Sequence, residues 1–228
     1  MDTLSKVLGT PFRRVLAIVS APYAVWFLLS LPSYPLLIDL FEDNRYYAEI
    51  MHLTGILSIQ LLVLTLAVTP FVLLVKRWET GRTVGRWLLK NRRYFGVASF
   101  GYALLHVVFY IRGTGSLYNI YLEAFDIAFA TGWIGFLLLI LLFATSNNES
   151  VRRLSRKWKS LQRLIYPATV AIFIHWFYFE FFWSDVIDWL IVLVIAKLIH
   201  LGLRWRTGST TRMDSRVNAP DVSKNNAL

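Results

Sequence analysis

Long apolar segments that recur at short intervals restrict the fold of this chain more than any other feature. A helix needs about 20 mainly apolar residues to cross the hydrocarbon of a bilayer, and several segments reach or approach that length. Hydrophobic residues make up 56% of the 228 residues, which is more than a water-facing surface tolerates. Because backbone polar groups inside a bilayer must be satisfied within the protein, we expect an all-α integral membrane bundle.

Six membrane spans can be drawn through these apolar segments. They cover residues 14–31, 49–75, 93–112, 127–145, 161–183 and 186–203. Residues 207–228 are polar and rich in serine, threonine and asparagine, so we expect them to be disordered. The predicted organisation is a cytoplasmic N-terminal segment (1–13), one six-span transmembrane domain (14–206) and a cytoplasmic tail.

The distribution of charge predicts which ends of the spans face the cytoplasm. Residues 76–93 contain seven Lys and Arg against one Glu, and residues 147–163 contain six against one Glu. The other connections between spans are mainly acidic. Since cytoplasmic loops are enriched in Lys and Arg, both basic segments and both termini are predicted to be cytoplasmic. The net charge of +10 then reflects topology, and we expect no nucleic-acid binding.

Two of the four histidines lie deep inside predicted spans. An ionisable side chain in a bilayer is costly unless it is paired, so each is a candidate functional residue. His106 is 13 residues beyond Arg93, and His175 is 13 residues beyond Gln162. At about 1.5 Å per residue, each lies roughly 20 Å above the inner boundary. The two imidazoles are therefore predicted to lie level, on the third and fifth spans.

Two level imidazoles on different helices match the axial ligands of a six-coordinate haem iron. The chain has no Cys, which excludes disulfides, thiolate metal sites, iron–sulfur clusters and covalent attachment of a c-type haem. We therefore predict a b-type haem with His106 and His175 as its iron ligands, and electron transfer as its chemistry. The alternative is that each histidine only hydrogen-bonds a neighbouring helix, as polar residues do in membrane bundles.

Three further residues are candidates for the same chemistry. His52, near the outer end of the second span, either approaches or ligates the haem, or is an interfacial residue. Arg112 lies six residues above His106, where its guanidinium could meet haem propionates, although an ordinary helix-end arginine explains it as well. His200, near the inner end of the sixth span, is a candidate ligand for a second haem or another interfacial residue.

Several short motifs follow one another in an order and spacing that resemble a known family. They are His52-Leu53-Thr54-Gly55, Thr69-Pro70, Arg92-Arg93-Tyr94-Phe95-Gly96, Leu105-His106, Lys157-Trp158 and Ile174-His175-Trp176. The pattern covers roughly residues 51–206. It resembles the ferric-reductase-like transmembrane domain superfamily, and within it most closely the MsrQ (formerly YedZ) group, the haem-binding membrane subunits of periplasmic methionine sulfoxide reductase systems.

The resemblance implies a six-helix cytochrome b of the bacterial inner membrane. It implies that electrons come from a cytoplasmic flavin or NAD(P)H reductase, or from quinol, and pass to a periplasmic molybdopterin oxidoreductase of the MsrP type. In the family, the arginine pair that matches Arg92 and Arg93 is linked to binding of flavin mononucleotide (FMN) at the inner face. One departure is Gln162, which stands where the family usually has a histidine; an amide is not a usual haem ligand, so no haem is expected on this residue.

With one haem in the outer half, electrons need another route across the inner half of the membrane. A flavin or a quinone near Arg92, Arg93, Trp158 and Gln162 would supply one. A second haem, with His200 as the replacement ligand, would supply another. The sequence leaves both routes open.

Two other functions fit part of the pattern. The chain has no Rossmann-type glycine-rich turn, so an electron donor is expected to be a separate protein. A self-contained transmembrane reductase of ferric iron, another metal or oxygen would share the haem but need no periplasmic partner. A non-redox transporter or scaffold would use the histidines as proton-relay or packing residues.

Overall fold

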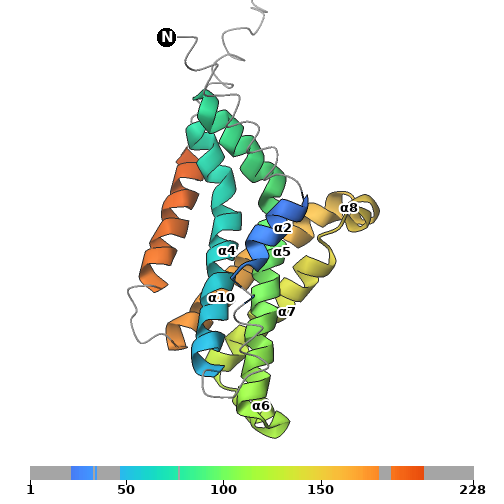
Figure 1. Ribbon diagram of the computed structural model, residues 1–228, viewed down its shortest axis with the longest axis vertical. Helices are drawn as coiled ribbons and strands as arrows, with labels where there is room; N and C mark the ends of the chain where they lie inside the picture. Colours follow the sequence, from blue (N-terminus) through green and yellow to red (C-terminus); the bar gives the residue numbers. More distant parts are fainter. Residues whose placement is uncertain (1–21, 33, 35–46, 77, 180–185, 203–228) are drawn as a thin grey trace, which may run out of the picture.

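The computed structural model describes residues 22–32, 34, 47–76, 78–179 and 186–202. Within these residues the regular structure is entirely helical, as predicted. The labelled helices are α2 (Pro22–Ser30), α4 (Tyr47–Val75), α5 (Glu79–Thr114), α6 (Leu117–Glu123), α7 (Ile127–Ala144), α8 (Asn148–Leu154), α9 (Arg156–Gln162) and α10 (Ile165–Phe179). A further helix covers residues 186–202. The long helices run along the long axis of the molecule, and α6 lies at one end (Figure 1).

Two pairs of closely packed helices form the centre of the bundle. In the first pair, α4 packs along α5, and two serines join them: the Ser58 hydroxyl donates to the Ser99 carbonyl at 2.9 Å, and the Ser99 hydroxyl donates back to the Ser58 carbonyl at 2.8 Å. In the second pair, α7 packs along α10, where a Cβ added at Gly135 would lie 2.6 Å from Ile172. Small residues let helix backbones approach closely, which membrane bundles use in place of a hydrophobic driving force.

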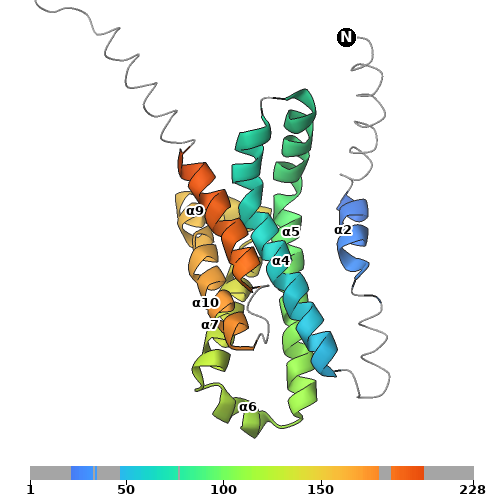
Figure 2. The ribbon, with the colours of Figure 1, turned by 90° about the vertical axis from the view of Figure 1, so that its left-hand side faces the viewer.

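The two pairs meet through apolar and aromatic side chains. Phe100 on α5 stacks on Phe143 of α7, with ring centroids 4.4 Å apart. Leu62 of α4 joins the same buried cluster as Leu139 of α7 and Ala168 of α10. On the outer side of the first pair, α2 lies beside α5 (Figure 2), where the Tyr102 hydroxyl donates to the backbone of α2.

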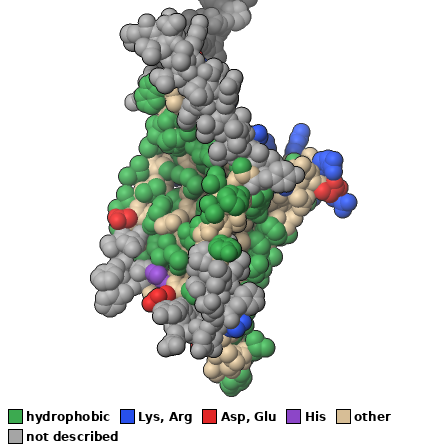
Figure 3. All heavy atoms as spheres, viewed as in Figure 1, with side chains coloured by type: hydrophobic (Ala, Val, Ile, Leu, Met, Phe, Trp, Pro, Cys, Tyr) green, Lys and Arg blue, Asp and Glu red, His purple; other side chains and the backbone are tan. Residues whose placement is uncertain are grey.

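The surface of the bundle is that of a membrane protein. Helices α4, α5 and α7 are long and apolar enough to cross a bilayer. Hydrophobic side chains cover most of the described surface in Figure 3, and basic side chains gather at α8. There the Glu149 carboxylate accepts hydrogen bonds from Arg152 and Arg153, which lowers the pKa of Glu149. The six-span count and the cytoplasmic position of both termini stay predictions.

Helix α5 begins far earlier than the charge pattern suggested. We expected residues 76–93 to be a connecting loop, but α4 ends at Val75 and α5 begins at Glu79. The basic residues mark where a helix leaves the hydrocarbon, whereas its backbone hydrogen bonds continue because Arg, Lys and Leu are good helix formers. The second basic segment likewise folds into α8 and α9 rather than a loop.

Parts of the predicted organisation lie outside the described residues. These are the N-terminal segment 1–13, the beginning of the first predicted span, the ends of the fifth and sixth predicted spans and the tail 207–228. The domain limits at 14 and 206 stay predictions.

The reciprocal serine bonds give a prediction about stability. Replacing Ser99 by Ala removes one hydroxyl donor between α4 and α5, so we expect the free energy of unfolding to fall by about 0.6 kcal/mol, and by less than about 2 kcal/mol. Unfolding in mixed micelles measures the change. Ser160→Ala on exposed α9 is the control and should change nothing; an equal loss at Ser160 would refute a specific role for the bond.

Candidate functional site

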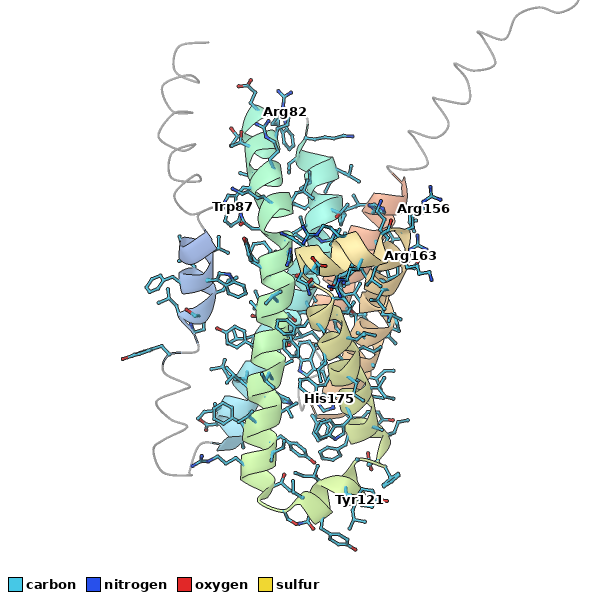
Figure 4. All side chains as sticks on the ribbon, turned by 90° about the vertical axis from the view of Figure 1, so that its right-hand side faces the viewer. Arg82, Trp87, Tyr121, Arg156, Arg163 and His175 are labelled. Atoms are coloured by element: carbon cyan, nitrogen blue, oxygen red, sulfur yellow. The ribbon has the colours of Figure 1, made fainter. Side chains whose placement is uncertain are left out.

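A cavity of about 340 Å³ lies between the two helix pairs. Both intramembrane histidines line it, His106 from α5 and His175 from α10. Their ring centroids are 6.1 Å apart and their planes are at 87° to each other. Figure 4 shows His175 in the interior, between α5 and the α7–α10 pair. The fold therefore brings together two residues that are 69 positions apart in the sequence.

Each imidazole is held by a backbone carbonyl of the neighbouring helix. The Nδ1 atom of His106 lies 2.7 Å from the Met51 carbonyl oxygen on α4, and the Nδ1 atom of His175 lies 2.7 Å from the Ala128 carbonyl oxygen on α7. A carbonyl only accepts, so each Nδ1 must carry the proton and donate it. In the neutral imidazole, Nε2 is then left with a free lone pair, which is the form that binds a metal ion.

The two carbonyls belong to segments with related sequence and the same hydrogen bonds. Residues 50–55 read Ile-Met-His-Leu-Thr-Gly, and residues 127–132 read Ile-Ala-Phe-Ala-Thr-Gly. In each segment the threonine hydroxyl donates to the carbonyls four and three residues before it, at 2.9 and 2.8 Å in the first segment and at 2.8 and 3.0 Å in the second. Hydroxyls that bond back in this way bend a helix slightly. Sequence reasoning missed the second segment, although the repeated Thr-Gly pair was a visible signal.

The glycine of each segment lies directly against the histidine ring. A Cβ added at Gly55 would lie 3.1 Å from Nδ1 of His106, and one added at Gly132 would lie 2.6 Å from Nδ1 of His175. Real Cβ contacts essentially never fall below 3.0 Å, so the ring of His175 occupies the space that any larger residue at position 132 would need. Each segment thus supplies both a hydrogen-bond acceptor and room for the ring.

Aromatic side chains form much of the remaining wall. The Tyr110 hydroxyl donates to Glu123 at 2.5 Å near the α6 end, and the Tyr110 ring lies near those of Phe129 and Trp133. Phe179 packs on the ring of His175 with centroids 4.9 Å apart. These walls make the cavity mainly apolar, as cofactor sites generally are.

The other outer candidates differ in position. His52 lines the same cavity and is exposed. Arg112 lies in the last turn of α5, is exposed and is not among the residues that line the cavity. His52 therefore lies close to the paired histidines, whereas Arg112 does not line their cavity.

The inner candidates bond to different parts of the structure. Arg92 donates to the Thr65 carbonyl at 2.9 Å and to the Thr69 hydroxyl at 3.1 Å, whereas Arg93 donates to Asn148 at 2.8 Å. Gln162 donates to the Thr145 hydroxyl at 3.2 Å. His200 lies with Arg92 in the lining of a second cavity.

The paired histidines fit a single metal centre. Two imidazoles on opposite sides of one ion hold their ring centres about 6 Å apart, since each metal–nitrogen bond is about 2 Å long. The observed separation of 6.1 Å agrees with this arrangement. The described residues contain no group of three or more His, Cys, Asp or Glu that could hold a metal ion. Two protein ligands suit an iron whose four other ligands come from a porphyrin.

The fold and this site define a helical membrane protein with two facing histidines between helix pairs. The chain belongs to the family described as the ferric reductase like transmembrane component, which residues 54–174 match. The superfamily expected from the motifs is thereby confirmed. The matched region contains His106 and ends one residue before His175.

Curated proteins of one kind are similar to most of the chain. The protein-methionine-sulfoxide reductase heme-binding subunit MsrQ of Xanthomonas campestris pv. campestris (strain B100) is 35% identical over 182 residues, which is 76% of each chain. MsrQ of Brucella ovis is 38% identical over 160 residues, which is 68% of this chain and 66% of the relative. No solved structure matches the chain.

Proposed function

We propose that this protein is a membrane electron-transfer subunit that holds one b-type haem between His106 and His175. The observation that carries the proposal is the pair of imidazoles 6.1 Å apart, each with its Nδ1 atom bonded to a backbone carbonyl. The family supports it, since curated relatives are named heme-binding subunits. When bound, haem supplies one-electron oxidation and reduction at its iron.

The protein's own residues prepare this site. The carbonyls of Met51 and Ala128 fix the tautomer and direction of each ring, and such outer hydrogen bonds also raise the basicity of the ligating nitrogen. The apolar and aromatic walls lower the polarity around the site, which is one of the ways in which a protein tunes a redox potential. His52 lies near enough to modulate the same centre.

We further propose the direction of electron flow. In a bacterial inner membrane, electrons would enter at the cytoplasmic face from a flavin reductase or from quinol, and would leave to a periplasmic methionine sulfoxide reductase of the MsrP type. The names of the relatives support the acceptor. Arg92 and Arg93 are the proposed contacts of a flavin at the inner face; in the structure Arg92 bonds α4 and Arg93 bonds α8.

A visible spectrum of the purified protein tests the haem. We expect low-spin b-type bands in the oxidised and reduced states and one haem per chain. Because the imidazole planes are at 87° to each other, the oxidised protein should give the strongly anisotropic low-spin EPR signal of perpendicular ligands rather than the rhombic signal of parallel ones. A colourless, folded preparation from haem-replete cells would contradict the proposal.

Electron flow to a partner tests the direction. The reduced holoprotein in proteoliposomes should reoxidise faster when an oxidised periplasmic methionine sulfoxide reductase is added outside. Equal reoxidation by ferric chelates or oxygen alone would instead favour the self-contained reductase.

A further inference from the structure

A second cavity, separate from the histidine pair, lies on the other side of α10. Its volume is about 860 Å³, and it is lined by α4, α10 and the helix at 186–202, together with Arg92 of α5. Along α10 its lining extends from Tyr166 to Tyr178, which is 12 residues, or roughly 18 Å at the rise of a helix. The cavity is therefore an elongated groove rather than a compact pocket.

The charged and basic side chains of this groove gather at one end. Lys197 places its Nζ atom 4.4 Å from the centre of the Tyr166 ring. The Nδ1 atom of His200 is buried and has no hydrogen-bond partner among the described residues. Arg92 uses part of its guanidinium on Thr65 and Thr69 and has further N–H groups to offer. None of the described residues that line the groove is Asp or Glu.

The rest of the groove is apolar. Away from Arg92, its lining includes Phe173, Phe177, Val186 and Leu190. The basic end lies at the same level of the bundle as α8, because Arg92 is followed by Arg93, which hydrogen-bonds Asn148 at the start of α8. The groove thus has a positive head at the predicted cytoplasmic boundary and an apolar body that extends into the membrane.

We propose that this groove is a binding site for an anionic phospholipid. The phosphate would lie among Arg92, Lys197 and His200, and one acyl chain would follow the apolar body of the groove. Basic residues near the cytoplasmic surface attract anionic lipid, and basic pockets between helices on this side bind anionic headgroups. A positive charge without a counter-ion is costly in a bilayer. A neutral amphiphile such as a quinone would leave the charges of Arg92 and Lys197 without one. The charge therefore favours the anion.

Native mass spectrometry of the delipidated holoprotein tests this proposal. The probes are phosphatidylglycerol, phosphatidylethanolamine with the same acyl chains, and a quinone. We expect phosphatidylglycerol to bind most tightly. Lys197→Gln should weaken its binding about fivefold, as expected for one basic residue, while Lys197→Arg should keep it. Because Lys197 is exposed, neither substitution disturbs the core, and the haem spectrum reports folding independently.

Lys90→Gln is the matched control. Lys90 carries the same charge on the same side of the membrane, is exposed and does not line the groove. It should leave phosphatidylglycerol binding unchanged. If Lys90→Gln and Lys197→Gln weakened phosphatidylglycerol binding equally, general surface charge would explain the binding, and the proposed site in the groove would be wrong. Tighter binding of the quinone than of phosphatidylglycerol would overturn the choice of ligand.

Discussion

Replacing His175 by Ala is expected to give a membrane-inserted helical protein that retains little haem. The imidazole supplies one of only two protein ligands proposed for the iron. Its closest protein neighbours are Phe179 on its own helix and Ala128 and Gly132 on α7, all within the α7–α10 pair. Replacing a residue that only hydrogen-bonds a metal ligand already lowers metal affinity about 10–100-fold. Loss of the ligand itself should therefore lower it at least as much. His106→Ala should do the same. Haem quantified per chain, together with the low-spin bands, measures the loss.

The fourth histidine provides the control for this experiment. His200 lies in the second cavity, and its Nδ1 atom has no hydrogen-bond partner among the described residues. His200→Ala should therefore keep one haem per chain and the low-spin spectrum. If His200→Ala lost haem while His175→Ala kept it, the iron would have to lie in the second cavity and our assignment would be wrong.

The sequence predicted the helical class and the equal depth of the two histidines. Both follow from the length of the apolar segments and from the regular rise of an α-helix. Apolar length sets which segments cross the bilayer, and counting about 1.5 Å per residue sets depth. Those two rules were enough to single out His106 and His175 as level residues. The rules do not specify which faces of two helices meet, so only the structure shows the 6.1 Å between the rings.

Some helix limits differ from those predicted. Charge marks the edge of the hydrocarbon, and α5 crosses that edge without a break, from Glu79 onward. The individual contacts of the inner candidates were not predicted either. Arg92 and Arg93 are consecutive on a helix, where neighbouring side chains point about 100° apart, so they contact α4 and α8 respectively. Gln162 bonds Thr145, which sequence spacing could not indicate.

The two Thr-Gly segments show how a repeated local structure can escape a search for long repeats. They are 77 residues apart and only six residues long. Each one serves a histidine on a different partner helix, so the site is built from two similar halves, α4 with α5 and α7 with α10. Because both halves use a carbonyl and a glycine, their substitutions should have related effects on haem binding.

Replacing Gly132 by Ala is expected to weaken haem binding about 10–100-fold, the cost of disturbing a ligand's supporting contacts. The new Cβ would lie 2.6 Å from Nδ1 of His175, so the ring must move away and its hydrogen bond to Ala128 must lengthen. Gly55→Ala should have a smaller effect, because its Cβ would lie 3.1 Å from the ring of His106. Haem titration measures the affinity, and the EPR signal should change shape as the ring planes leave their perpendicular arrangement.

Gly101→Ala separates this effect from a general response of helices to alanine. Gly101 is on α5, and a Cβ added there meets nothing within 4 Å. Alanine stabilises a helix interior by up to about 1 kcal/mol relative to glycine, so this variant should bind haem normally and be at least as stable. The expected order of haem affinity is wild type and Gly101→Ala, then Gly55→Ala, then Gly132→Ala. Normal affinity and an unchanged EPR signal in Gly132→Ala would mean that the ring of His175 is not held by α7 when the iron is bound, and the role of the second Thr-Gly segment would have to be abandoned.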